Sequence, residues 1–182
     1  MNSEVPVEQD QLRQIRKVFA DAGPDTLVSR MGIKILEASA ERVVGSMPVD
    51  GNTQPYGLLH GGASCVLAET LGSVGSALHA GPDRITIGIE ISATHHRGAA
   101  AGEVTGVATR VHGGRTMTTY EIVITDEAGR RVCTARLSCL LRDAVPGRAQ
   151  ATPAAQATPA AQATTPAAQA GQETGIQESG AH

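Results

Sequence analysis

The sequence predicts an α+β fold in which a curved antiparallel sheet wraps around one long central helix, with a further helix near the N-terminus. Residues 61–80 form a long apolar segment with the length of a helix. Residues 85–142 contain four strand patterns joined by short turns, which implies antiparallel pairing. Because the long helix is the only element able to cover the apolar face of such a sheet, we expect the sheet to curl around it.

The remaining elements follow from turn residues and apolar spacing. Residues 8–22 carry apolar side chains at three- and four-residue intervals before Gly23-Pro24, which predicts an amphipathic helix. Short strands are expected at 33–39 and 42–48, and the central helix should end at Gly81-Pro82. The four later strands are expected at 85–94, 103–112, 116–125 and 131–142.

Two of these elements carry further expectations. In the strand from Ile85, isoleucines alternate with small or polar residues as far as Ala93, so one regular face of this strand should be buried. In the central helix, Gly72 and Gly75 each cost roughly 1 kcal/mol relative to alanine. We expect close approach of another backbone as the compensation.

The 182 residues suffice for one domain and a tail. Residues 151–169 repeat the pattern ATPAAQ, and regularly spaced proline prevents a continuous helix. The expected organisation is a flexible N-terminus at 1–10, a folded domain at 11–145 and a disordered tail rich in Ala, Thr, Pro and Gln at 146–182.

Composition narrows the class of protein. Fifteen Lys and Arg against 18 Asp and Glu, a net charge of −3, argue against nucleic-acid binding. The N-terminus does not resemble a signal peptide and no stretch is apolar enough to span a membrane, so a cytoplasmic protein is expected. The three cysteines lack paired spacing, which predicts reduced, buried thiols rather than disulfides or a zinc site.

Glu69 is the most informative residue, because it places a carboxylate inside an otherwise apolar helix. Burying such a group is costly unless it is paired, and catalytic acids and bases often occupy such positions. Glu69 is therefore a candidate catalytic group.

The start of the same helix offers a complementary group. His60-Gly61-Gly62 precedes the first turn, where backbone N–H groups lack partners and the helix dipole is positive. Gly61 N–H is the candidate oxyanion donor, and a flexible loop without a ligand is the alternative. Eight residues separate Gly61 from Glu69, about 12 Å along a helix. Both can act on one carbonyl only if two copies pair with antiparallel helices, which places the site at a dimer interface.

Three neighbouring residues have two possible roles each. Gln54 either donates to the carbonyl or water, or is an ordinary turn residue. His60 either orients substrate or caps the loop. Ser73, one helical turn after Glu69, is placed to hydrogen-bond the carboxylate or the water.

Other kinds of site fit the sequence less well. Gly61-Gly62 lacks the Lys and Ser/Thr of a phosphate-binding loop. His95-His96 have no carboxylate or thiol at ligand spacing, so no metal is predicted. No G-x-S-x-G nucleophile elbow is present.

Taken together, the run from Gln54 to Gly62, the following Leu67 to Ser73 and the segment Gly88 to Arg97 resemble hotdog-fold acyl-CoA thioesterases. The closest resemblance is to the PaaI-like branch, which includes 4-hydroxybenzoyl-CoA thioesterases with a catalytic glutamate on the central helix. It extends over roughly residues 12–143.

The resemblance implies hydrolysis of an acyl-CoA to a carboxylic acid and coenzyme A, without a cofactor or metal. Glu69 would be the general base or nucleophile, Gly61 would polarise the thioester carbonyl, Gln54 and His60 would assist, and Ser73 matches a Ser/Thr position near the glutamate. The family places these groups across the interface of a homodimer, often within a dimer of dimers (a homotetramer). The positions that resemble its coenzyme A contacts are Arg97, Arg115, Thr116 and Arg142.

The identity of the acyl group is left open. The domain contains few aromatic residues, so an aliphatic pocket that accepts aryl or medium-chain acyl groups is expected. A non-catalytic acyl-CoA-binding protein, such as a sensor or carrier, is the alternative, although it would not need the Glu69 carboxylate. A hydratase on the same fold is disfavoured because the sequence has no Asp/His pair in that family's characteristic loop.

Overall fold

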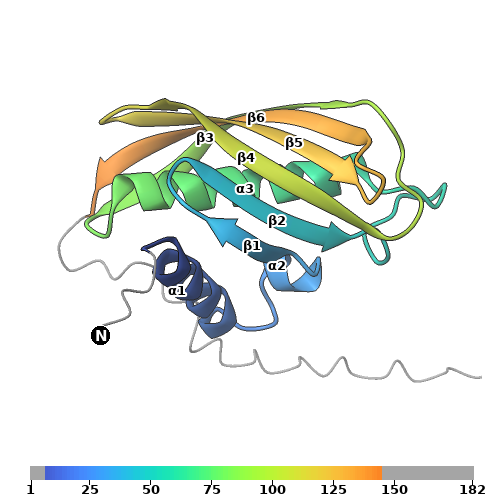
Figure 1. Cartoon of the computed structure of the whole chain (residues 1–182), viewed down its shortest axis with the longest axis horizontal. Coiled ribbons are helices and arrows are strands. Elements are labelled where there is room, and N and C mark those ends of the chain that lie inside the picture. Colours follow the sequence, from blue (N-terminus) through green and yellow to red (C-terminus); the bar gives the residue numbers. More distant parts are fainter. Residues whose placement is uncertain (1–6, 145–182) are drawn as a thin grey trace, which may run out of the picture.

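The structure, a computed structural model, describes residues 7–144 and has the predicted architecture. A six-stranded antiparallel sheet curves around the long helix α3 (Gly61–Ala80), as Figure 1 shows. The strand order is β1-β2-β4-β5-β6-β3, so β1 and β3 form the two edges. The strands are β1 (Lys34–Ala38), β2 (Arg42–Pro48), β3 (Arg84–His95), β4 (Glu103–Gly113), β5 (Met117–Asp126) and β6 (Arg131–Asp143).

Helix α3 packs its apolar side directly into the concave face of the sheet. Leu67, Ala68 and Leu71 are fully buried there. Gly45 and Gly106 face each other on β2 and β4, and a Cβ on either would overlap the Leu71 side chain. Glycines in the sheet therefore provide the space that lets the helix sit close to it.

The glycines within α3 serve the same packing from the helix side. A Cβ on Gly72 would overlap Leu137, and one on Gly75 would overlap the Tyr120 ring. The Tyr120 hydroxyl then donates to Ala40 O at 2.6 Å. The expectation that these glycines admit another backbone is wrong, because side chains of the molecule's own sheet occupy the space.

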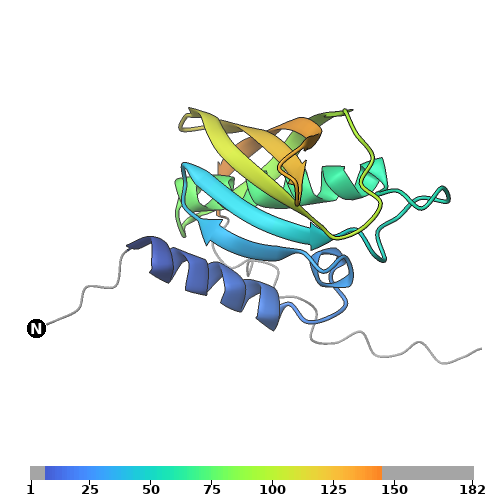
Figure 2. The same cartoon turned by 45° about the vertical axis from the view of Figure 1, so that its right-hand side comes forward.

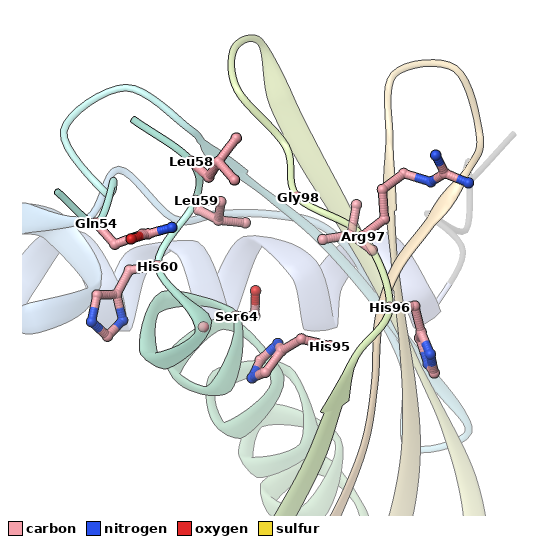
Figure 3. Close-up of a pocket in the computed structure, with 11 residues that line it drawn as sticks. Gln54, Leu58, Leu59, His60, Ser64, His95, His96, Arg97 and Gly98 are labelled. Atoms are coloured by element: carbon pink, nitrogen blue, oxygen red, sulfur yellow. The ribbon is translucent and has the colours of Figure 1, made fainter. Parts of the chain in front are cut away.

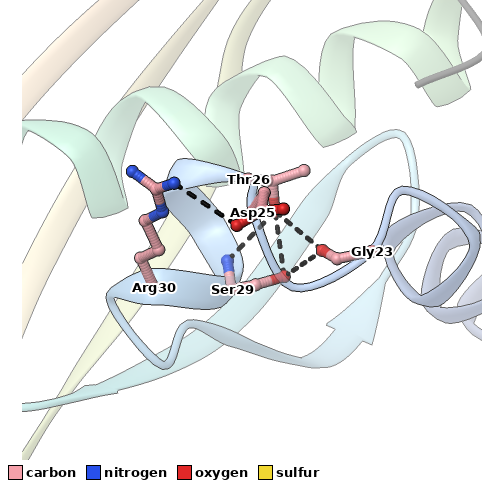
Figure 4. A network of polar contacts seen from close by, with 5 residues as sticks. All are labelled: Gly23, Asp25, Thr26, Ser29 and Arg30. Atoms are coloured by element: carbon pink, nitrogen blue, oxygen red, sulfur yellow. Dashed lines mark hydrogen bonds and ion pairs between the residues drawn. The ribbon is translucent and has the colours of Figure 1, made fainter. Parts of the chain in front are cut away.

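Helix α1 (Val7–Asp21) covers the β1 edge, as Figure 2 shows. Arg16 Nε donates to Ile35 O at 3.0 Å, which ties the helix to the strand. A short helix α2 (Leu27–Arg30), not predicted from the sequence, links the two. Thr26 caps it by accepting from Ser29 N and donating to Ser29 Oγ, within the network drawn in Figure 4.

Strand β3 departs from its predicted pattern. Its isoleucines are 37% to 54% exposed, so the prediction of a buried face is wrong for this chain taken alone. The regular alternation also fails, because a bulge shifts the pairing with β6 between Gly88 and Glu90. As a result Ile87 and Ile91, which share a face in the sequence pattern, lie on opposite faces of the sheet.

The predicted tail at 146–182 lies outside the described residues. Residues 7–10, which belong to the expected flexible N-terminus, form the start of α1. Within residues 7–144, no helix has the length and apolar character needed to cross a membrane.

Candidate active site

The loop before α3 is held in place by backbone hydrogen bonds. Gln54 N donates to Leu58 O at 2.8 Å, and His60 N donates to Asn52 O at 2.9 Å. Leu59 N donates to Ala99 O at 2.7 Å, which joins this loop to the segment after β3. The loop and the end of β3 therefore form one unit beside the start of α3.

A pocket of about 470 Å³ opens between these segments (Figure 3). It brings together Gln54, His60 and Gly61, three of the residues predicted from the sequence. The rest of its lining consists of Leu58, Leu59, Ser64, His95, His96, Arg97, Gly98 and Val132.

The first N–H groups of α3 are not equally available. Gly62 N donates to His60 Nδ1 at 2.8 Å, while Ala63 N and Ser64 N donate to His60 O. Within residues 7–144, Gly61 N–H has no acceptor. A hydrogen-bond donor at the positive end of the helix dipole is therefore left for a ligand.

His60 is the N-cap of α3, which agrees with the capping role considered for it. Because its Nδ1 accepts from Gly62 N–H, the neutral imidazole carries its proton on Nε2. Capping therefore leaves His60 Nε2–H available as a second donor.

His95 is a site residue that the sequence reasoning missed. Its ring lies over Gly61, so that a Cβ added to Gly61 would be 2.8 Å from His95 Nε2. The next residue, His96, follows the end of β3, and its Nε2 hydrogen-bonds Thr134 Oγ1 on β6 at 3.0 Å. The described residues contain no group of three or more His, Cys, Asp or Glu suited to a metal. The signal that could have found His95 is its position at the end of a strand beside the helix start.

Glu69 lies apart from this pocket, further along α3. Its carboxylate packs against Gly88 on β3, where any Cβ would overlap Oε1. Burial raises the pKa of the Glu69 carboxyl above its ordinary value. No hydrogen bond or ion pair to this carboxylate is found within residues 7–144. Ser73 lies on the next turn of α3 and makes no hydrogen bond to the Glu69 carboxylate within the described part of the chain.

A cationic pocket of about 380 Å³ lies at the opposite end of β3. It is lined by Arg115, Thr116 and Arg142, all predicted from the sequence, and by Arg84, which was not. The Arg84 guanidinium is held by Asp143 Oδ1 at 3.3 Å and by Leu141 O at 3.3 Å.

Within one chain, however, the predicted coenzyme A contacts do not all lie together. Arg97 lies in the pocket beside Gly61, thirteen residues from Arg84 and so about 40 Å away along an extended strand. A single subunit therefore separates Arg97 from the other three predicted residues.

Comparison with known proteins identifies the family. Residues 56–133 match the family model described as the thioesterase superfamily. The chain is 50% identical over 114 residues to the proofreading thioesterase EntH of Cronobacter turicensis. The aligned region covers 62% of this chain and 83% of that protein.

Solved structures of thioesterases also match this chain. A thioesterase from Haemophilus influenzae superposes with a TM-score of 0.69 at 31% identity, covering 75% of this chain and 94% of the other. A Staphylococcus aureus thioesterase, solved as a glutamine-to-alanine mutant, has a TM-score of 0.61 at 33% identity, covering 64% of this chain and 98% of the other. The chain therefore belongs to the thioesterase superfamily and is a thioester hydrolase with the hotdog fold.

Proposed function

We propose that the protein hydrolyses acyl-CoA thioesters, as a member of the PaaI-like branch that includes the 4-hydroxybenzoyl-CoA thioesterases, with Glu69 as general base or nucleophile. The observation that carries this proposal is the partly buried Glu69 carboxylate, which has a raised pKa and no ion-pair partner among the described residues. Such a group costs stability, and an active site is where that cost is commonly found.

Two comparison structures support the choice of Glu69 and Gln54. The Staphylococcus aureus protein was also solved with a glutamate replaced by alanine, fifteen positions after the glutamine replaced in the other structure. Gln54 and Glu69 have the same separation here. The spacing supports assigning both residues to one site.

The site needs a second subunit. Glu69 lies beside Gly88, whereas Gly61 lies beside His95, and both strand residues belong to the free edge of the sheet. If two β3 strands pair antiparallel with Gly88 opposite the partner subunit's His95, the Glu69 carboxylate comes about one strand spacing, roughly 5 Å, from the strand that borders the partner's Gly61. This pairing would also give the free backbone edge of β3 a hydrogen-bonding partner.

The same register would bring Arg97 of one subunit close to Arg84 and Arg142 of the other. With Gly88 opposite the partner's His95, Thr86 lies opposite the partner's Arg97. Ile85, the residue before Thr86 on β3, pairs with Arg142 on β6, and Arg84 lies one residue further along β3. One register thus assembles the proposed acid/base site and a cluster of guanidinium groups suited to the phosphates of coenzyme A. A homodimer is the minimum unit, and a dimer of dimers is compatible with it.

In the proposed reaction, Gly61 N–H hydrogen-bonds the thioester carbonyl oxygen and stabilises the negative charge that develops on it. Gln54 and His60 Nε2–H add donors to the carbonyl or to water. Glu69 of the other subunit either takes a proton from the attacking water or attacks the carbonyl carbon itself. The carbon–sulfur bond then breaks, and the coenzyme A thiolate takes up a proton. In the direct route the acyl group remains on Glu69 as an anhydride, which water hydrolyses in a second step. Both routes consume one water and give a carboxylic acid and the thiol of coenzyme A.

A panel of aryl and medium-chain acyl-CoAs, with release of free thiol as readout, tests this proposal. We expect wild-type turnover with at least one class, and a loss of at least about a hundredfold in Glu69→Ala, the scale of a lost acid/base group. Full activity in Glu69→Ala would refute the assignment.

A further inference from the structure

The turn between β4 and β5 lies beside the last turn of α3, and a side chain of the helix holds it there. The half-buried His79 hydrogen-bonds Gly114 O through Nε2 at 3.1 Å. A Cβ added to the preceding Gly113 would be 3.0 Å from His79 Cε1, so the ring packs directly on the turn. Within the turn itself, Gly114 N donates to Met117 O at 2.9 Å. His79 therefore joins the end of the helix to the turn.

The other ring nitrogen of His79 faces a cation. Arg110 Nη1 lies 2.9 Å from His79 Nδ1. Because a guanidinium can only donate, Nδ1 accepts, and the neutral ring carries its proton on Nε2, which donates to Gly114 O. Arg110 is in turn held by Glu41, through an ion pair from Nη2 to Oε1 at 2.9 Å and a hydrogen bond from Arg110 N to Glu41 O at 2.9 Å. Both nitrogens of the imidazole thus have a partner, which fixes its orientation.

The turn carries two residues of the cationic pocket. Arg115 and Thr116 follow Gly114 directly, and both line that pocket. Leu141 N donates to Thr116 O at 2.8 Å, which fixes the Thr116 end of the turn to β6. The Arg115 side chain makes no ion pair in the part of the chain that the structure describes, so its guanidinium is available to an anion. His79 holds the other end of the turn, one residue before Arg115.

We propose that His79 is a positioning residue for coenzyme A, which holds the β4–β5 turn so that Arg115 and Thr116 meet the phosphates of the bound substrate. This inference rests on the proposed function, which assigns the cationic pocket to coenzyme A. His79 does not touch the substrate and acts only through the turn. A backbone that is fixed before binding raises affinity, because less conformational freedom is lost when the phosphates are bound.

Pantetheine separates this role from a purely structural one. It keeps the thiol arm of coenzyme A and lacks the pyrophosphate and the phosphorylated nucleotide. The ratio of the dissociation constants of pantetheine and coenzyme A therefore measures the contribution of the phosphate-bearing part. A contact that only stabilised the end of the helix would change the melting temperature and leave this ratio unchanged.

His79→Leu removes both hydrogen bonds and keeps a side chain of similar size. We expect calorimetric titration with free coenzyme A to give a dissociation constant about threefold or more above that of wild type, the scale of one hydrogen bond, with that of pantetheine within about twofold. With the acyl-CoA of highest turnover as substrate, KM should rise by a similar factor and kcat should stay within about twofold. His79→Gln, whose amide can accept from Arg110 and donate to Gly114 O, should restore coenzyme A binding.

Two further variants decide the interpretation. Arg110→Met breaks the same chain of contacts from the β4 side, and His79→Leu should add little to it, because the two residues act through one interaction. Leu78→Ala removes packing against the core from the neighbouring position of α3, so it should lower the melting temperature and leave the ratio unchanged. If leucine at position 79 prevents folding, Arg110→Met alone applies the same test. An unchanged ratio in the folded variant, or an equal change in Leu78→Ala, would overturn the inference.

Failure here can be told apart from failure of the proposed function. If the wild-type protein binds coenzyme A more tightly than pantetheine and His79→Leu leaves that ratio unchanged, only the role of His79 is wrong. If the wild-type protein binds both equally, the assignment of the cationic pocket to coenzyme A is itself wrong. The Glu69 mechanism is tested separately, by turnover in Glu69→Ala.

Discussion

The Glu69 carboxylate lies directly against the backbone of Gly88, on the free edge strand of the sheet. In the proposed dimer, this contact sets the position along β3 at which the carboxylate would meet the second subunit. It also requires a residue without a side chain at position 88, since any Cβ there would overlap Oε1.

We therefore expect Gly88→Ala to displace the carboxylate and lower kcat by at least about tenfold, because small errors in position are costly for acid/base groups. Thiol-release kinetics would measure the change. Thr94→Ala, on the same strand, is the control and should retain near wild-type turnover. Wild-type kcat in Gly88→Ala would mean that the contact does not position Glu69.

The raised pKa of Glu69 predicts a pH dependence. Either proposed role needs the ionised carboxylate, so kcat/KM should fall as the pH drops through the Glu69 pKa, at a midpoint above the ordinary glutamate value of about 4.3. A pH profile of acyl-CoA hydrolysis checks this. A profile that stays flat down to pH about 4 would contradict it.

The raised pKa of Glu69 should make the stability of the protein fall as the pH rises, whereas its activity should increase. A carboxyl whose pKa is raised on folding binds its proton more tightly in the folded state, so its contribution to stability falls as the pH rises from the ordinary value through the raised one. Glu69→Gln should therefore have a higher melting temperature than wild type at pH 7. The difference should vanish well below pH about 4, where both side chains are neutral. A lower melting temperature for Glu69→Gln at pH 7 would contradict the assignment of burial as the cause.

Gly75 provides a test of the packing of α3. Replacement by alanine gains roughly 1 kcal/mol of helix propensity, whereas overpacking a core costs about 1–3 kcal/mol. Because a Cβ would be 2.6 Å from the rigid Tyr120 ring, we expect the overpacking to dominate and Gly75→Ala to unfold at lower denaturant concentration. Ala77→Gly, at an exposed position of the same helix, measures the propensity effect alone. A stabilised Gly75→Ala would show that the ring moves freely.

Features encoded locally were predictable from the sequence. The spans of α3 and β2 agree with the prediction because His60 and Gly81 bound the helix and the strand follows a clear apolar pattern. Gln54, His60 and Gly61 converge because they belong to one loop and one helix start.

Features that depend on contacts between distant segments were not predictable. The bulge in β3 depends on its register with β6, so regular alternation misassigned the face of Ile87. His95 meets Gly61, and Arg84 meets Arg142, only through the sheet. The Gly72 and Gly75 contacts arise from side chains on β5 and β6, which no local pattern identifies.

The most direct test of the central claim is complementation between two inactive subunits. Differently tagged Gln54→Ala and Glu69→Ala chains are co-expressed, and the mixed dimer is purified through both tags. If each site combines Glu69 of one subunit with the helix start of the other, the mixed dimer contains one site with neither defect and should show about half of the wild-type turnover per dimer. Turnover no higher than that of the two mutant homodimers would contradict the account, because every site would then carry a defect.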